Sequence, residues 1–169
     1  MWQVQPRLLG VAVAKQLGLA LIEGDNHHSA DSLGKMRSGV ALTDADRRRP
    51  RWLVNCSWRT AWQPDNCSSA ELTCSALKRV YRDRLRRAAP GLQFVYLDIH
   101  HSQARARVTA RAAQHFSSTK LVHIQLATLK VPTGEAGVLR VDATASLADL
   151  QGQVCAWLNT PQSTPKEAA

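Results

Sequence analysis

The chain of 169 residues is long enough to form one domain with a hydrophobic core. Hydrophobic residues make up 44% and charged residues 21%, which is typical of a globular domain, and no apolar run reaches the ~20 residues that a membrane span requires. The formal net charge of +9 predicts attraction to anions, among them phosphates and carboxylates.

Apolar segments predict strands at about residues 19–24, 69–74, 92–98 and 138–142. Apolar stripes at helical spacing predict helices between them, over residues 8–17, 76–87 and, as one or more arginine-bearing helices, 102–130. Strands that alternate with helices indicate a parallel α/β sheet. Ligands of such sheets bind beyond the carboxyl ends of the strands, which is where Asp25, Cys74 and Asp98 fall.

The ends of the chain and its cysteines bear on processing and location. The segment that starts at Pro6 weakly resembles a signal peptide, and we favour an amphipathic helix there. The 4 cysteines contain no C-x-x-C pair, so they predict neither a zinc site nor a disulfide framework, and a cytoplasmic location fits best. The polar tail, residues 159–169, is expected to be flexible.

Basic residues recur at helical spacing in two segments. Lys78, Arg82 and Arg86 follow one another at four-residue steps, which places them on one face of a helix that begins just after a strand. That face either clamps an anion, with help from the helix N-terminus, or is a solvated surface with internal ion pairs. Arg107 and Arg111 also share a helical face, and the same two interpretations stay open for them.

The histidine pairs and one run of arginines each have a functional interpretation and a purely structural one. Adjacent histidines, at 27–28 and 100–101, are candidate metal ligands, but neighbouring residues of an extended chain point to opposite sides and zinc needs three or four convergent ligands. We therefore expect hydrogen-bonded or solvent-facing histidines. The run "RRRPR" at residues 47–51 suggests a nucleic-acid patch, although Pro50 favours an exposed loop.

Long blocks of the chain resemble the motifs of the gluconokinase family, P-loop kinases that phosphorylate D-gluconate. The family reads G-D-x-x-H-P and then N-x-x-K-M-x-x-G-x-P-L-x-D-x-D-R, and the matching positions here are Gly24, Asp25, His28, Lys35, Met36, Gly39, Leu42, Asp44, Asp46 and Arg47. The C-S-A-L-K-x-x-Y-R-D-x-L-R block matches residues 74–86. The family's R-x-G-H-F and S-Q-F-x-T-L-x-x-P segments match Arg111, His115, Phe116, Gln125, Thr128, Leu129 and Pro132, with one extra residue in the first.

The resemblance covers about residues 9–158 and implies a three-layer α/β/α fold with a parallel sheet, as in P-loop kinases. It implies a kinase domain over residues 1–158 with a mobile lid at about 102–132. It also implies that ATP, with Mg²⁺, donates a phosphoryl group to the 6-hydroxyl of gluconate. Oligomeric state, a homodimer included, is left open.

The resemblance further implies roles for single residues. Asp25 is expected to hydrogen-bond the attacking hydroxyl and take its proton. Lys78 and Arg82 are expected to act in catalysis and, with Arg47, to hold the substrate carboxylate or the phosphoryl group. The other substrate-binding candidates are His28 and Lys35, and the arginines expected to close over the ATP phosphates are Arg107 and Arg111.

The chain departs from the family at the nucleotide-binding loop. No G-x-x-x-x-G-K-[ST] motif occurs in the sequence, and the expected place, residues 5–8, reads Gln-Pro-Arg-Leu. The strand that precedes this loop is missing as well, which should leave the neighbouring central strands without their partner, unless "WQVQ" at residues 2–5 serves as a short substitute. Glu71 falls within a strand that should be buried, where an unpaired carboxylate is costly.

Three interpretations follow from the sequence. The first is a gluconokinase-family chain with an incomplete nucleotide site. The second is a non-catalytic relative, a pseudokinase that binds gluconate or another sugar acid. The third is a basic nucleic-acid-binding module, which fits less well because Phe, Trp and Tyr make up only 5% of the residues and offer little surface for stacking bases.

Overall fold

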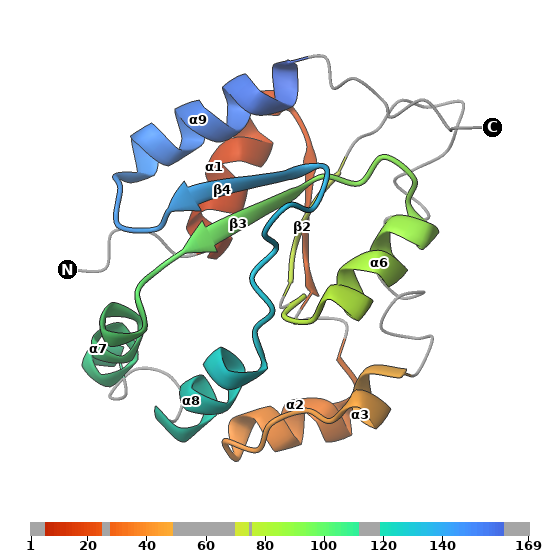
Figure 1. Cartoon of the computed structure of the whole chain (residues 1–169), viewed down its shortest axis with the longest axis vertical. Coiled ribbons are helices and arrows are strands. Elements are labelled where there is room, and N and C mark those ends of the chain that lie inside the picture. The colour runs from red at the N-terminus through yellow and green to blue at the C-terminus, as the bar shows by residue number, and fades with distance from the viewer. Residues whose placement is uncertain (1–5, 25–27, 49–69, 75, 112–118, 161–169) are drawn as a thin grey trace.

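The structure is a computed structural model, and it describes residues 6–24, 28–48, 70–74, 76–111 and 119–160. Helices and strands alternate along most of the chain (Figure 1). The strands are β1 (Ala20–Glu23), β2 (Ala70–Thr73), β3 (Phe94–Asp98) and β4 (Val138–Asp142). The helices are α1 (Pro6–Leu17), α2 (Ala30–Arg37), α3 (Asp44–Arg48), α6 (Arg79–Ala88), α7 (His101–Arg111), α8 (Thr119–Thr128) and α9 (Leu147–Asn159).

Within the described residues the strands form two parallel pairs. In the first pair, β1 runs beside β2 with Ala20 opposite Ala70 and Glu23 opposite Thr73. In the second pair, β3 runs beside β4 over five residues each. The predicted parallel α/β fold is therefore confirmed. Residues 2–5, the suggested substitute, lie outside the described residues.

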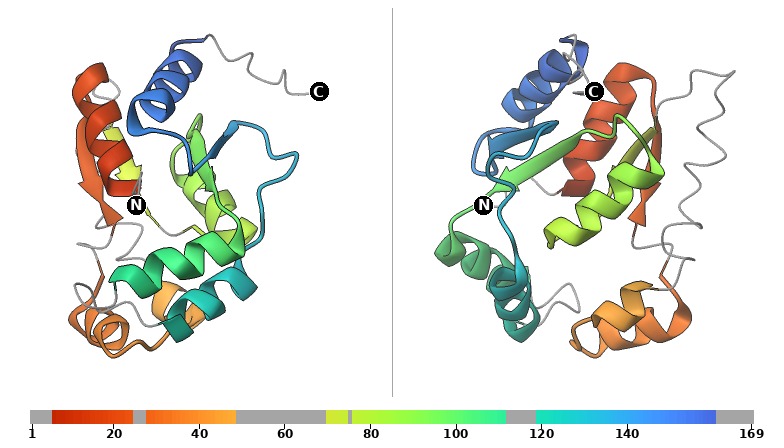
Figure 2. Two further views of the ribbon diagram at one scale, coloured as in Figure 1. Left: turned by 90° about the vertical axis from the view of Figure 1, so that its left-hand side faces the viewer. Right: turned by 45° about the vertical axis from the view of Figure 1, so that its right-hand side comes forward.

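Helices on both faces complete the three layers. α1 packs on β1 and β2, α9 packs on β4, and the two helices contact each other. They cover one face of the strands, while α6 lies on the other (Figures 1 and 2). The core is apolar and lies between α1, α9 and β4, with buried residues Leu9, Val13, Val141, Leu150, Val154 and Cys155. Because α1 packs on β1 and β2 and also contacts α9, which packs on β4, the two helices link the two strand pairs.

The chain turns sharply between these layers. Gly18 links α1 to β1 with a φ of 68°, a left-handed conformation that glycine adopts without a steric cost. Ser29 and Ser146 cap α2 and α9, because each hydroxyl accepts a hydrogen bond from the backbone N–H three residues later. These local signals fix where the helices begin.

Most of the predicted elements are found within one or two residues of their predicted bounds, and the exceptions are helical. The region predicted as one or more arginine-bearing helices contains α7 and α8, which pack against each other. Whether they move as a lid stays a prediction, as do the domain bounds. α2 and α9 were not predicted individually. No helix of the described part is long and apolar enough to cross a bilayer.

Candidate active site

A cavity of about 490 Å³ lies at the carboxyl ends of β1 and β2, a size common for small-molecule sites. Its walls come from the end of each strand, from α2, α3 and the segment between them, from the start of α6, and from α8. The lining residues are Gly24, His28, Met36, Val40, Ala41, Leu42, Thr43, Asp44, Ala45, Cys74, Leu77, Lys78, Tyr81, Ile124, Gln125 and Thr128.

Gly24 allows the floor of this cavity to form. A Cβ atom at this position would lie 2.7 Å from the backbone oxygen of Thr73 and 3.1 Å from the Cβ of Cys74. Only glycine therefore permits the ends of β1 and β2 to approach so closely. The chain leaves this close contact directly toward Asp25, which lies outside the described residues.

The start of α3 carries two carboxylates with separate partners. Asp46 accepts hydrogen bonds from the backbone N–H and the hydroxyl of Thr43, each at 2.8 Å, which fixes the first turn of the helix. It also accepts one from the Lys35 ammonium at 2.6 Å. Lys35, followed by Thr43, holds the pKa of Asp46 well below its usual range. Lys35 is thus paired with Asp46 and is not among the residues that line the cavity.

Asp44, the other carboxylate, joins α3 to α6 across the cavity. The Lys78 ammonium donates to both of its oxygens, at 2.7 and 2.9 Å, and the Tyr81 hydroxyl donates to Oδ1. Lys78 also lies 5.7 Å from the centre of the Tyr81 ring. Asp44 raises the pKa of Lys78, so the lysine carries a full charge at neutral pH. A cation, a carboxylate and a phenol therefore meet at one point of the cavity wall.

The N-terminus of α6 adds to this positive region. Lys78 is the residue that precedes the helix, and its side chain does not cap the helix. The first backbone N–H groups of a helix carry a positive partial charge that attracts anions. This end of the cavity is consequently suited to a negatively charged group.

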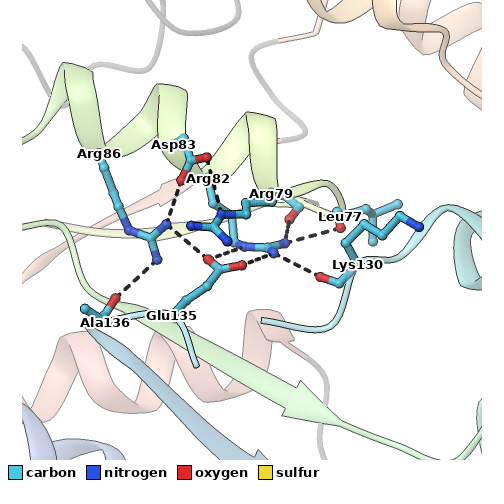
Figure 3. Close-up of polar contacts among 9 residues, drawn as sticks. Leu77, Arg79, Arg82, Asp83, Arg86, Lys130, Glu135 and Ala136 are labelled. Atoms are coloured by element: carbon cyan, nitrogen blue, oxygen red, sulfur yellow. Dashed lines mark hydrogen bonds and ion pairs between the residues drawn. The ribbon is translucent and has the colours of Figure 1, made fainter. Parts of the chain in front are cut away.

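Arg82, predicted to contact substrate, is buried beside this wall and is not among the cavity-lining residues. Its guanidinium donates to Glu135 and to the backbone oxygens of Ala76, Leu77 and Lys130 (Figure 3). These hydrogen bonds use all three nitrogens of the arginine side chain. Direct contact between Arg82 and a substrate would require this network to open, and its predicted role stays a prediction.

The remaining predicted site residues are spread over the structure. His28 is among the residues that line the cavity, and its expected contact with substrate stays a prediction. Arg107 lies on α7, where its guanidinium donates to the backbone oxygen of Ala143 at 3.1 Å. Arg47 belongs to α3 and Arg111 ends α7, but their side chains are not described.

Sequence reasoning missed several of the lining residues. Asp44 and Tyr81 were matched to family motifs without a role, yet the two side chains meet in the cavity. The cavity also receives Ile124, Gln125 and Thr128 from α8. The family-like D-x-D and S-Q-x-x-T patterns contain some of these residues, but spacing alone does not reveal that distant segments converge.

The residues present do not fit the usual phosphate-binding loop of this kind of kinase. α1 begins at Pro6, whose nitrogen has no hydrogen to donate, and the sequence lacks the lysine and the glycines of that loop. Arg7 lies where the loop is expected, but its Nε atom is 2.5 Å from Oε1 of Glu23, with which it forms an ion pair. Across the described ranges, no group of three or more His, Cys, Asp or Glu side chains is arranged to hold a metal ion.

Known proteins resemble this chain along most of its length. Over 133 residues it is 38% identical to the gluconokinase of Gluconobacter oxydans, covering 79% of this chain and 73% of that protein. The crystal structure of a gluconokinase from Sinorhizobium meliloti superposes with a TM-score of 0.78 at 38% identity, covering 90% and 84% of the two chains. An unliganded sugar kinase from Janibacter superposes with a TM-score of 0.80 at 32% identity, covering 92% and 88%. No family model matches the chain.

Proposed function

Because the chain belongs to the gluconokinase family, we propose that it binds D-gluconate in the cavity at the ends of β1 and β2, as the acceptor of a phosphoryl group from ATP. By family it is an enzyme, a sugar-acid kinase. The observation that carries the proposal is the meeting of Lys78, Asp44 and Tyr81 on the cavity wall, next to the N-terminus of α6.

Lys78 is suited to receive the carboxylate of gluconate. Its ammonium has three N–H donors, and in this structure Asp44 accepts from it. The carboxylate of gluconate would share this ammonium with Asp44 or displace Asp44 from it. The positive partial charge at the N-terminus of α6 would also stabilise the negative charge of gluconate. We propose that Lys78 leaves Asp44 in part when gluconate binds.

Asp44 and Tyr81 are suited to the hydroxyl groups of the sugar acid. A carboxylate accepts hydrogen bonds and a phenol both donates and accepts, which matches a chain of hydroxyls. From α8, Gln125 and Thr128 add an amide and a hydroxyl to the lining. Apolar neighbours, among them Leu77 and Ile124, cover the carbon chain and limit the access of water.

Asp25 is proposed as the group that orients the 6-hydroxyl and takes its proton. It follows Gly24, which lines the cavity at the end of β1, and its carboxylate type suits this task. His28 is proposed to contact the substrate from the same edge of the cavity. Lys35 is proposed to act without touching the substrate, by holding Asp46 and with it the start of α3 in place.

The donor side of the reaction is less complete in this chain than the acceptor side. The family implies that ATP is the phosphoryl donor, and kinases usually bind ATP together with Mg²⁺. Arg107 and Arg111 are proposed to approach the phosphates from α7, but the sequence offers no loop to cradle them. We therefore propose the acceptor function in detail and leave the transfer step to experiment.

The missing loop favours a second candidate, a relative that binds a sugar acid without phosphorylating it. The two candidates share the cavity and differ only in turnover. They are separated by measuring ADP release in the presence and absence of gluconate.

For the kinase, gluconate accelerates ADP release from ATP and Asp25→Asn removes most of that acceleration. For the non-catalytic relative, calorimetry detects saturable binding of gluconate without ADP release. Salt-sensitive binding to nucleic acid with no binding of sugar acids would contradict both and would favour the nucleic-acid module.

A further inference from the structure

An ion-pair network connects α6 to the segment between α8 and β4 (Figure 3). Arg82 and Arg86 project from α6, and both donate to Glu135, which lies just before β4. The side chains of Arg82 and Glu135 are each only 5% exposed. A carboxylate so deeply buried between two guanidinium groups is held well away from solvent, and its position is fixed by them.

Glu135 binds Arg82 with two parallel hydrogen bonds. Arg82 donates from Nε to Oε2 at 3.0 Å and from Nη2 to Oε1 at 2.5 Å, the fork geometry that makes such pairs strong and directional. Arg86 adds a bond of 3.1 Å from Nη1 to Oε2 and reaches the backbone oxygen of Ala136 at 3.3 Å. Glu135 is therefore the one anion in this network that Arg82 contacts among the described residues.

The guanidinium of Arg82 also holds two backbone segments together. Nη1 donates to the backbone oxygens of Ala76 at 2.9 Å and Leu77 at 3.2 Å, and Nη2 donates to that of Lys130 at 3.0 Å. The backbone N–H of Lys130 in turn donates to the oxygen of Leu77 at 2.9 Å. Leu77 and Lys130 are thus clamped to each other directly and through Arg82.

These clamped residues adjoin the parts of the cavity lining that come from the start of α6 and from the end of α8. Leu77 and Lys78 line it from the start of α6. Lys130 comes two residues after Thr128, which lines it from the end of α8 together with Gln125. The spacing between these two parts of the lining is consequently set where Arg82, held by Glu135, joins the backbone of Leu77 to that of Lys130.

We propose that Glu135 is a positioning residue for the sugar-acid site. By orienting Arg82, it fixes the end of α8 against the residue that precedes Lys78, and so sets the shape of the cavity without touching the substrate. This inference rests on the proposed function for its effect on gluconate, while the clamp itself can be tested without any ligand.

The test compares Glu135→Gln with Asp83→Asn in the full chain. The glutamine keeps the size of the side chain, but it presents an N–H where Arg82 needs an acceptor and it leaves the buried guanidinium without its counter-charge. Asp83→Asn makes the same chemical change on α6, where Asp83 pairs with Arg79 and Arg86 and touches neither backbone segment. It therefore controls for a general loss of charge pairing.

Two readouts separate positioning from simple stabilisation. Hydrogen exchange of the Lys130 amide reports the clamp, and exchange of the Leu97 and Val141 amides in β3 and β4 reports the stability of the whole fold. We expect Glu135→Gln to accelerate exchange at Lys130 at least about tenfold more than at Leu97 and Val141, and to weaken gluconate binding about tenfold. Asp83→Asn should change both by less than about threefold.

The proposal would be overturned if Glu135→Gln accelerated hydrogen exchange equally at all three amides, or left the exchange rate of Lys130 unchanged. It would also be overturned if the Lys130 amide exchanged faster while the affinity for gluconate stayed the same. If the wild-type chain binds no gluconate while the Lys130 amide behaves as expected, the proposed function fails and the clamp stands. Should Glu135→Gln fail to fold, Glu135→Asp is measured in its place. It keeps the charge and shortens the reach, and it is expected to give the same pattern with smaller factors.

Discussion

Lys78 shows how a single residue changes meaning once its surroundings are known. In the sequence it is one cation among many on a basic chain, and its spacing to Arg82 and Arg86 suggested three equivalent charges on one face. In the structure Lys78 faces the cavity and Asp44, while Arg82 is buried in an internal network with Glu135. Only Lys78 of the three lines the cavity, so we assign it the anion-binding role.

The first prediction concerns that role. Lys78→Ala should weaken gluconate binding roughly 10- to 100-fold, because a charge-assisted hydrogen bond to the carboxylate is lost. Lys15→Ala, at an exposed position on α1, should leave the affinity unchanged and is the matched control. Calorimetric titration of both variants with gluconate gives the two affinities. An unchanged affinity in Lys78→Ala would show that the carboxylate binds elsewhere.

The second prediction concerns the close approach at Gly24. Gly24→Ala places a methyl group 2.7 Å from a backbone oxygen, so the strand ends must separate, and we expect the free energy of unfolding to fall by about 1–3 kcal/mol. Gly34→Ala, in the interior of α2, meets no atom within 4 Å and should raise it by about 0.5–1 kcal/mol, because alanine favours helix. Urea unfolding measures both changes. The prediction fails if the two variants shift stability in the same direction.

At the scale of elements, α6 connects the parts of the site. Its first residues contribute to the cavity, its buried face carries Tyr81 and Leu85, and Arg82 and Arg86 reach the segment before β4. Arg86 also stacks over the ring of Phe94 in β3, with the guanidinium carbon 4.7 Å from the ring centre. One helix thus holds the cavity, the strands and the α8–β4 segment in a fixed relation.

The third prediction follows from the charge on Glu135. The hydrogen bonds from Arg82, supported by those from Arg86, lower the pKa of Glu135 to about 2, from 4.5 in an unfolded chain. The stabilisation is therefore complete above pH 4.5 and is lost as the pH falls toward 2. Between about pH 6 and pH 3 the wild type should lose about 2 kcal/mol more stability than Glu135→Gln. Urea unfolding at the two pH values tests this, and parallel losses in the two proteins would contradict it.

The strands could be predicted because each is short, is mostly apolar and ends in a polar residue, although β2 and β4 contain the charged residues Glu71 and Arg140. The helices α2, α3 and α9 were not predicted, although Ser29 and Ser146 signal the starts of α2 and α9 and the core residues Leu150, Val154 and Leu158 of α9 follow helical spacing. The cavity could be predicted only in part. Asp44 and Tyr81 are 37 positions apart, and Arg82 and Glu135 are 53 apart, and no local pattern encodes contacts over such separations.

At the scale of the whole molecule, two parallel strand pairs share one helical core. The cavity lies at the ends of β1 and β2, and β3 and β4 lead into α7 and α9. The contact between α1 and α9 links the pairs, and the side chain of Glu71 in β2, where the sequence suggested a costly carboxylate, is half-buried with its Oε2 atom shielded from solvent. The Oε2 atom of Glu71 has no hydrogen-bond partner within the described part of the chain.

The fourth prediction concerns this carboxyl group. Burial raises the pKa of Glu71 to about 7, from 4.5 when unfolded, so the folded state favours the protonated form. Stability should then fall as the pH rises from 4.5 through 7. Glu71→Gln should match the wild type at about pH 5 and exceed its stability at about pH 8 by about 1–2 kcal/mol, since partial access to solvent moderates the cost of the charge. Thermal unfolding of both proteins at both pH values gives the comparison. An equal gain in stability at the two pH values would show that the charge of Glu71 is not its cause.

Recognition of a sugar acid by its carboxylate, in the cavity at the ends of β1 and β2, is the step on which the proposed function depends. The most direct test is calorimetric titration of the folded chain with D-gluconate and with D-glucitol, which has the same carbon chain with a CH₂OH group in place of the carboxylate. We predict saturable binding of one gluconate per chain and glucitol binding at least about tenfold weaker, because Lys78 and the N-terminus of α6 favour a negative charge. Equal affinity for the two ligands, or no saturable binding of gluconate, would contradict this mode of recognition.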